Sequence, residues 1–148
     1  MNDCVSHPKN PKEGGQSMIE LAISLIVLLL LLAGIIDLGR AFFTYMTMRD
    51  AAQEGAAYGS LFPGDGAGII TRTRNATNAP IDMSNADIQV AASVVGGDAC
   101  AGSGIRVDVT YDNFPMIMPL FSVFMGRSTI PLHAWVTDEI LRPPCPTP

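Results

Sequence analysis

The sequence contains few charged residues. Asp, Glu, Lys and Arg make up 16% of its 148 residues, against roughly 25% in an average soluble protein. The 14 acidic and 9 basic residues leave a net charge of −5, which argues against a nucleic-acid partner, because such proteins are usually basic. Hydrophobic residues reach 48%, so the chain as a whole is not intrinsically disordered, since disorder needs low hydrophobicity and high charge.

Residues that usually bind metals or cofactors are also scarce. The chain has two histidines, His7 and His133, and three cysteines, and they do not fall at a metal-ligand spacing. The sequence contains neither a P-loop nor a dinucleotide-binding fingerprint. We therefore predict no catalytic, cofactor or metal site and no small-molecule substrate, which makes an enzyme the least favoured class of function.

One long apolar run dominates the N-terminal part of the sequence. Leu21–Ile36 comprises sixteen uncharged residues, and adding Met18 and Ile19 gives nineteen residues interrupted only by Glu20. A helix of that length spans roughly 28 Å, close to the hydrocarbon thickness of a bilayer. We predict a transmembrane span over about residues 18–36 rather than a buried core helix, because no other part of the chain could cover such an apolar cylinder.

A cleaved secretory signal explains this run less well. The run is long for the apolar part of a signal, and no small-x-small cleavage site follows it. The flanking positive charges do not orient the span, because two precede it and two follow it. They are Lys9 and Lys12 before the span, and Arg40 and Arg49 after it.

Helical sequence continues beyond the span. There is no proline between Lys12 and Pro63, and apolar or small residues recur at spacings of three and four up to Ala56. One helix is therefore predicted from about Ser17 to Gly59, roughly 65 Å long. Its far end is rich in alanine and glycine, which permits close packing either on another helix or on a sheet of the same chain.

The region after residue 60 has the patterns of a small α+β head. A short helix is predicted over Ala67–Asn78, after a break rich in glycine and proline. Three later segments alternate apolar and polar residues, as half-buried strands do. These segments are Ile88–Val94, Ile105–Tyr111 and Ile130–Val136. Pro131 confines the last strand to an edge or to its own start. The predicted fold class is therefore α+β: a long transmembrane helix that continues into a head with a roughly three-stranded antiparallel sheet.

An uncharged segment, Phe114–Met125, separates the second and third predicted strands. It is too short to span a membrane, and Pro115 and Pro119 interrupt it. It could cover the sheet as core, or it could present methionine and phenylalanine side chains to a membrane surface or a partner. We favour partial burial combined with contact to a partner. The Pro-rich tail, residues 142–148, is expected to be extended.

A processing motif precedes the span. Gly15 is followed by Gln16 and, at the fifth position after the glycine, by Glu20, which is the signature of a prepilin peptidase substrate. Cleavage after Gly15 would make Gln16 the first residue, and Glu20 of a neighbouring subunit could then neutralise the new ammonium group. A carboxylate inside an apolar segment usually has such a partner or function. Ser17 and Glu20 also fit a helix capping box, and both interpretations can hold together.

Taken together, these features resemble the TadE-like family, the pseudopilin or minor-pilin-like proteins of Tad/Flp tight-adherence pilus systems. The resemblance rests on residues 15–20, the leucine-rich span, residues 36–40 and residues 51–56. It is strong over residues 15–60 and weaker over the head, where Val107–Thr137 still follows the family pattern. It implies processing by a type IV prepilin-type peptidase and contacts with other pilus subunits and the assembly platform. It also implies a bacterial inner-membrane protein with a cytoplasmic N-terminus and an extracytoplasmic head.

Asp37, Gly39 and Arg40 form a motif at the outer end of the predicted span. Asp37 and Arg40 are one helical turn apart and can form an ion pair there. The resemblance adds that this motif recurs at this place in the family, without assigning it a mechanism.

The cysteine count is odd, which matters if the leader is removed. Cys4 lies in the leader, so cleavage would leave Cys100 and Cys145 as an even pair in an oxidising compartment. The two residues could form a disulfide that tethers the tail to the head, or they could remain as free thiols.

The predicted organisation has four parts. They are a cleavable leader (1–15), the N-terminal helix (16–60), the head (61–141) and the tail (142–148). Two functions remain open. The first is a membrane-anchored pseudopilin or minor pilin that takes part in assembly of a Tad-type pilus. The second is an uncleaved single-pass envelope protein whose head binds a partner protein.

Overall fold

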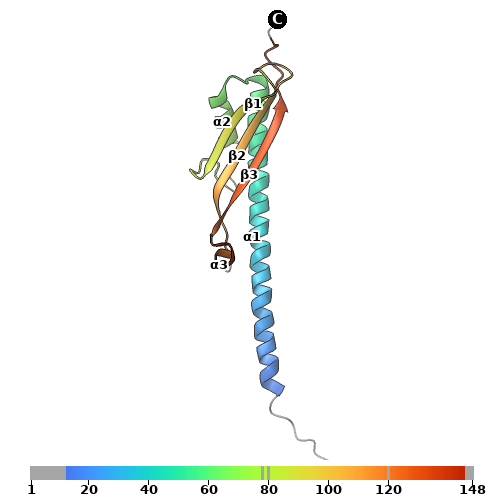
Figure 1. The fold of residues 1–148 in the computed structure, drawn as a ribbon, viewed down its shortest axis with the longest axis vertical. Coiled ribbons are helices and arrows are strands. Elements are labelled where there is room, and N and C mark those ends of the chain that lie inside the picture. Colours follow the sequence, from blue (N-terminus) through green and yellow to red (C-terminus); the bar gives the residue numbers. More distant parts are fainter. Residues whose placement is uncertain (1–12, 78, 80, 120, 146–148) are drawn as a thin grey trace, which may run out of the picture.

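The computed structural model describes residues 13–77, 79, 81–119 and 121–145 (Figure 1). Most of the predicted leader, with Cys4, His7, Lys9 and Lys12, lies outside the described residues. The elements are α1 (Glu13–Leu61), α2 (Gly66–Asn75), β1 (Ile88–Val95), β2 (Gly104–Pro115), α3 (Phe121–Met125) and β3 (Thr129–Glu139). A long N-terminal helix followed by a small three-stranded antiparallel sheet confirms the predicted α+β class.

α1 is one continuous helix of 49 residues, roughly 75 Å long at the usual helical rise. Its lower half projects from the head, and its upper half lies against the sheet (Figure 1). The helix begins at Glu13, one turn before the predicted start at Ser17. The predicted capping box at Ser17 is therefore wrong, since that residue lies inside the helix. Gly14 and Gly15 do not end the helix, because a glycine costs only about 1 kcal/mol and, unlike proline, keeps its backbone donor.

The apolar span of α1 is not covered by a protein core. Leu21, Leu31 and Ile35 are 65%, 65% and 67% exposed. Burying each such side chain is favourable by about 1.5–3 kcal/mol, so the run as a whole requires an apolar environment. Within the described part of the chain, α1 is the one helix long and apolar enough to cross a membrane. The protein is therefore anchored in a membrane by α1.

The sheet has the order β1-β2-β3, and both pairings are antiparallel. In the middle of the sheet, Val107 of β2 lies opposite Ala92 of β1 and Val136 of β3. Pro131 falls on the edge strand β3, where a residue without an N–H group interrupts no pairing on the open side. The prediction of an edge position is confirmed. The register of β2 against β3 shifts between Tyr111 and Phe114, and the two strands pair again from Phe114 to the end of β2.

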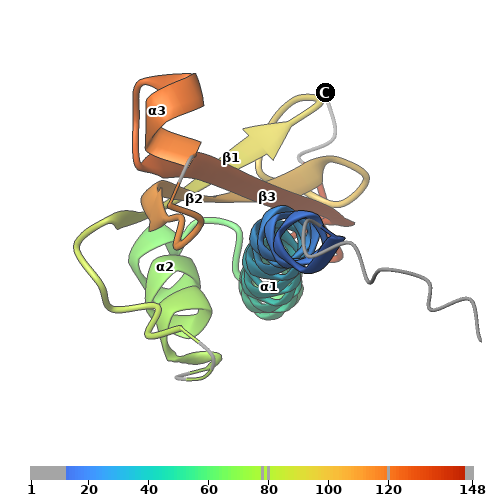
Figure 2. The ribbon, with the colours of Figure 1, turned by 90° about the horizontal axis from the view of Figure 1, so that it is seen from below.

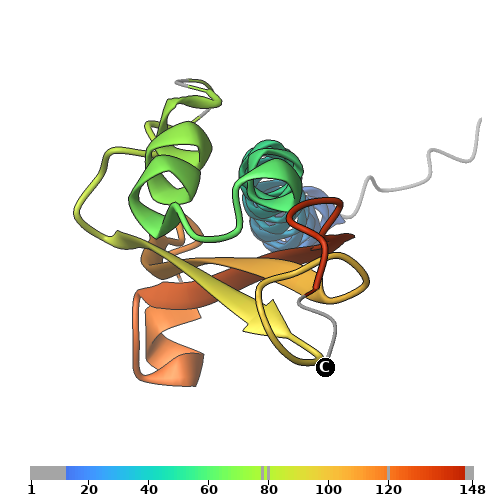
Figure 3. The same ribbon diagram turned by 90° about the horizontal axis from the view of Figure 1, so that it is seen from above.

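The upper half of α1 and the whole of α2 cover one face of the sheet (Figures 2 and 3). The core between these layers is made of fully buried side chains from all of them. They include Met48, Ala51, Ala52, Ala56, Ile69, Ile105, Val107 and Val109. The small residues at the far end of α1 thus pack on the sheet and on α2 of the same chain, which was one of the two alternatives left open. Asp65 caps α2 by accepting a hydrogen bond from the Gly68 N–H at 2.9 Å.

The opposite face of the sheet carries a polar and aromatic cluster. Arg106 donates hydrogen bonds to both carboxylate oxygens of Asp108, and its guanidinium stacks 4.5 Å from the centre of the Trp135 ring. His133 Nε2 lies 3.1 Å from Asp108 Oδ1. Partial burial acts to raise the pKa of Asp108, but the hydrogen bonds and charge of Arg106, together with His133, outweigh it and hold the pKa below its usual value.

Removing the Asp108 carboxylate is expected to cost little, and only above about pH 4. Asp108→Asn should destabilise the head by about 0.5–1 kcal/mol at about pH 7, the magnitude of a partly exposed ion pair. Because the pKa of Asp108 is lower in the folded protein than in the unfolded chain, this stabilisation is complete above about pH 4 and is lost as the pH falls further. Thermal unfolding of both proteins in detergent, monitored by Trp135 fluorescence, measures the difference. Equal stability at neutral pH would contradict the expectation.

Candidate functional site

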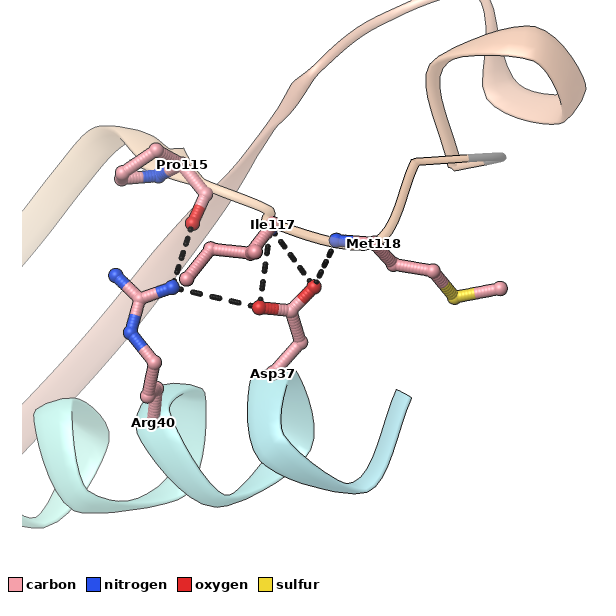
Figure 4. A network of polar contacts seen from close by, with 5 residues as sticks. All are labelled: Asp37, Arg40, Pro115, Ile117 and Met118. Carbon is pink, nitrogen blue, oxygen red and sulfur yellow. Dashed lines mark hydrogen bonds and ion pairs between the residues drawn. The ribbon is translucent and has the colours of Figure 1, made fainter. Parts of the chain in front are cut away.

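Asp37 is a fully buried carboxylate on the mostly exposed lower part of α1. Its exposed fraction is 0%, whereas its neighbour Leu38 is 71% exposed. The backbone N–H of Ile117 donates to its Oδ1 and Oδ2 at 3.0 and 2.8 Å, and the N–H of Met118 donates to Oδ2 at 2.7 Å (Figure 4). The carboxylate therefore fixes the segment after β2 onto α1, across about eighty residues of sequence.

Arg40 completes the charge balance of this site. Its Nη1 donates to Asp37 Oδ1 at 3.3 Å and lies 3.5 Å from the carbonyl oxygen of Pro115 (Figure 4). The guanidinium also sits 5.3 Å from the centre of the Phe114 ring, close enough for a cation–π contact. The ion pair expected from the spacing of Asp37 and Arg40 is thus present. A methyl group added at Gly39 would meet no atom within 4 Å.

The site provides hydrogen-bond acceptors for backbone N–H groups at the end of the span. Residues 116–118 are not helical, so their N–H groups need partners other than the carbonyl groups of a helix. Asp37 supplies these partners for Ile117 and Met118. Sequence reasoning missed these two donors. The available signal was an aspartate at the end of an apolar run together with an uncharged, Pro-containing segment elsewhere, but nothing in either pattern specifies that the two meet.

An apolar cavity of about 410 Å³ opens one helical turn above this site. Its walls include Phe43 of α1 and Tyr111 and Phe114 of β2. Among the described residues that line it, Arg40 is the only charged one, and Arg40 already pairs with Asp37. The cavity therefore extends the apolar base of the head and carries no ligand assignment.

The residues of the predicted processing motif lie far from this site. Gly15, Gln16 and Glu20 occupy the exposed first turns of α1, and Gln16 Nε2 donates to Glu20 Oε1 at 3.2 Å. Gly15 precedes Asp37 by 22 residues on one helix, or roughly 33 Å. A methyl group at Gly15 would meet no atom within 4 Å. The structure thus brings Asp37 and Arg40 together and leaves Gly15, Gln16 and Glu20 as a separate, accessible segment.

The two remaining cysteines meet at the opposite end of the head. Cys100 and Cys145 are joined by a disulfide, with Cα atoms 4.9 Å apart. The backbone next to them is also paired: the Ala101 N–H donates to the Pro143 carbonyl at 2.8 Å, and the Leu141 N–H donates to the Ser60 carbonyl at 2.8 Å. The described part of the tail is therefore attached to the loop between β1 and β2, and Leu141, the residue before the tail, is attached to the top of α1.

Fold and site together define a membrane-anchored protein with one spanning helix and a small α+β head folded onto the upper half of that helix. A comparison with protein families matches residues 15–57 to the family described as TadE-like protein. This match confirms the resemblance and identifies most of α1, from Gly15 through Asp37 to the small residues of the core, as a TadE-like segment. Comparisons with curated proteins and with solved structures gave no match.

Proposed function

We propose that this protein is a pseudopilin or minor pilin that takes part in assembly of a Tad-type pilus. The observation that carries the proposal is the TadE-like match, which covers the exposed apolar helix. In pilin-like subunits one such helix serves two purposes: it anchors the subunit in the membrane, and it packs against other subunits in the assembly. The role is structural rather than catalytic, and its partners are other pilus subunits and the assembly platform.

The proposal includes processing and a defined orientation. A type IV prepilin-type peptidase would cleave between Gly15 and Gln16 from the cytoplasmic side of the inner membrane, leaving the head outside the cytoplasm. The exposure of both residues at the lower end of α1 is compatible with access by a peptidase. Glu20, one helical turn from Gln16, would then neutralise the new ammonium group of a neighbouring subunit within lipid.

The intact mass of the protein from its native membrane tests the processing step. Loss of residues 1–15 leaves 133 of the 148 residues, beginning with Gln16. Reduction of the same sample should add two hydrogens, as expected for a disulfide between Cys100 and Cys145. A full-length mass would mean that the leader stays on the protein, and would favour the uncleaved envelope protein whose head binds a partner.

The assembly role is tested by Glu20→Ala. We expect pilus assembly to fall at least about tenfold, which corresponds to the loss of roughly 1.4 kcal/mol per subunit contact, while the amount of protein in the membrane is unchanged. Glu54→Ala is the matched control, because Glu54 is an exposed glutamate on the same helix but lies beside the head. If Glu20→Ala assembles pili as well as Glu54→Ala does, Glu20 has no role in assembly and the pilin interpretation loses its mechanism.

A further inference from the structure

The lowest part of the head reaches the level of the membrane span. This part, here called the lower loop, consists of residues 116–119 and α3. Figure 1 shows α3 below the sheet, at the height of the middle of α1 rather than near its upper end, and Figure 2 shows it apart from α1, across the sheet. A methyl group added at Gly34 would lie 3.8 Å from Met118 Sδ, and Gly34 belongs to the apolar run. The Met118 side chain therefore reaches the level of Gly34, about 5 Å below Asp37 along α1 and within the predicted span.

The exposure of residues along α1 is consistent with this contact. Leu30, Ala33 and Gly34 are half-buried, although most other residues of the span are exposed. Their spacing of three and one, followed by three more residues to Asp37, places them on one face of the helix. That face leads to the carboxylate that binds Ile117 and Met118. One side of the upper span is thus turned toward the protein's own loop, while the other sides remain free for lipid.

The side chains of the lower loop are suited to an apolar environment. No charged residue lies between Asp112 and Arg127. Ile117, Val123 and Met125 are 62%, 74% and 64% exposed, and no other helix or strand of the described chain packs on α3. An exposed, uncharged surface that continues the surface of a membrane span has lipid as its natural partner.

The non-helical backbone of the lower loop is paired within the protein. Ile117 and Met118 donate to Asp37, and Pro119 has no N–H group. Two further N–H groups of the lower loop bond within the chain: Met116 donates to the Ser128 carbonyl and Phe121 to the Met118 carbonyl. Non-helical backbone is tolerated at membrane depth when its polar groups are satisfied by the protein in this way.

We propose that the lower loop inserts into the head-side leaflet of the bilayer, so that the protein contacts lipid at two places, α1 and α3. Ile117, Val123 and Met125 would contact acyl chains near the headgroup boundary, and Arg127, directly after the loop, would lie at the level of the lipid phosphates. The Asp37 carboxylate makes this insertion possible by binding the loop backbone. The inference requires only that α1 spans the membrane and does not depend on the pilus role.

The test places a tryptophan in the lower loop of the full-length protein in vesicles. The chain has a single tryptophan, Trp135, so the background variant is Trp135→Phe, which keeps an aromatic ring beside Arg106. Val123→Trp is the probe, and Met125→Trp is a second probe at an equally exposed position. Val95→Trp is the control: it is 45% exposed, at the end of β1 that lies beside Gly104, near the top of α1.

In vesicles of phosphatidylcholine brominated near the top of the acyl chains, we expect both loop probes to have blue-shifted emission and to lose most of their fluorescence. Val95→Trp should keep its emission in the same vesicles. Unquenched, red-shifted emission from both loop probes would place the loop in water and overturn the proposal. Emission that is blue-shifted but unquenched, and only at high protein-to-lipid ratio, would mean that a second copy covers the loop, and would overturn it equally. Because the vesicles contain no pilus component, a failure here is distinct from a failure of processing or assembly.

Discussion

Asp37→Ala is expected to release the segment after β2 from α1. The substitution leaves the N–H groups of Ile117 and Met118 without an acceptor and Arg40 without its ion-pair partner. Arg40 is 38% exposed and can be solvated, so the cost comes mainly from the two N–H groups, at about 1–3 kcal/mol for each donor left without an acceptor. For a total of about 3 kcal/mol, the amides of Ile117 and Met118 should lose hydrogen-exchange protection by roughly 100-fold, which mass spectrometry or NMR on the detergent-solubilised protein can measure.

The matched control for this substitution is Asp50→Ala. Asp50 is an exposed aspartate on the same helix, 13 residues further along, so its loss should leave the protection of the loop unchanged. Asp37→Asn offers an intermediate case, because the amide keeps one acceptor oxygen but loses the negative charge that faces Arg40. Protection at Ile117 and Met118 that is the same in Asp37→Ala and Asp50→Ala would show that the carboxylate does not hold the loop.

Gly55→Ala is expected to separate α2 from α1. A methyl group at Gly55 would collide with the Thr73 hydroxyl and would lie 3.3 Å from Thr73 Cβ. Thr73 has no room to move, because it is fully buried and its hydroxyl donates to the Ile69 carbonyl at 2.9 Å. Overpacking of this kind costs about 1–3 kcal/mol. Even after a gain of up to about 1 kcal/mol in helix propensity, the head should unfold at a clearly lower temperature.

Two further variants separate this collision from the general effect of replacing a helical glycine. Gly39→Ala makes the same change on α1 where no atom lies within 4 Å, so it should be neutral or slightly stabilising. Thr73→Ala removes the colliding hydroxyl, and combining it with Gly55→Ala should recover part of the lost stability in a double-mutant cycle. Strictly additive effects of the two substitutions would contradict the proposed contact.

Local patterns in the sequence predicted the elements of this fold except the short helix α3. The apolar run and the absence of proline predicted α1, and alternation predicted all three strands, because these signals depend on neighbouring residues alone. The spacing of Asp37 and Arg40 likewise predicted their ion pair. The start of α1 was placed one turn too late, since glycines weaken a helix without ending it.

The sequence did not predict which segments far apart in the chain contact one another. Ile117 and Met118 donate their backbone N–H groups to Asp37. Every residue except proline has such a group, so the residue type does not indicate this contact. The same holds for the close approach of Gly55 to Thr73, where the glycine was recognised as permissive but its partner was not. Both contacts depend on how the register of β2 and the path after it place residues against α1, and that path is set by tertiary packing.

The continuity of α1 has a mechanical consequence. The helix passes from the span into the core of the head without a proline, and such helices bend only gently over their length. The head is thus carried on a stiff rod rather than on a flexible tether, so its tilt relative to the bilayer follows the tilt of the span. Any force that draws the span out of the membrane, as assembly of a filament would require, acts directly on the core. With the lower loop inserted as proposed, extraction must also withdraw that loop from the leaflet, and the Asp37 attachment would carry the load.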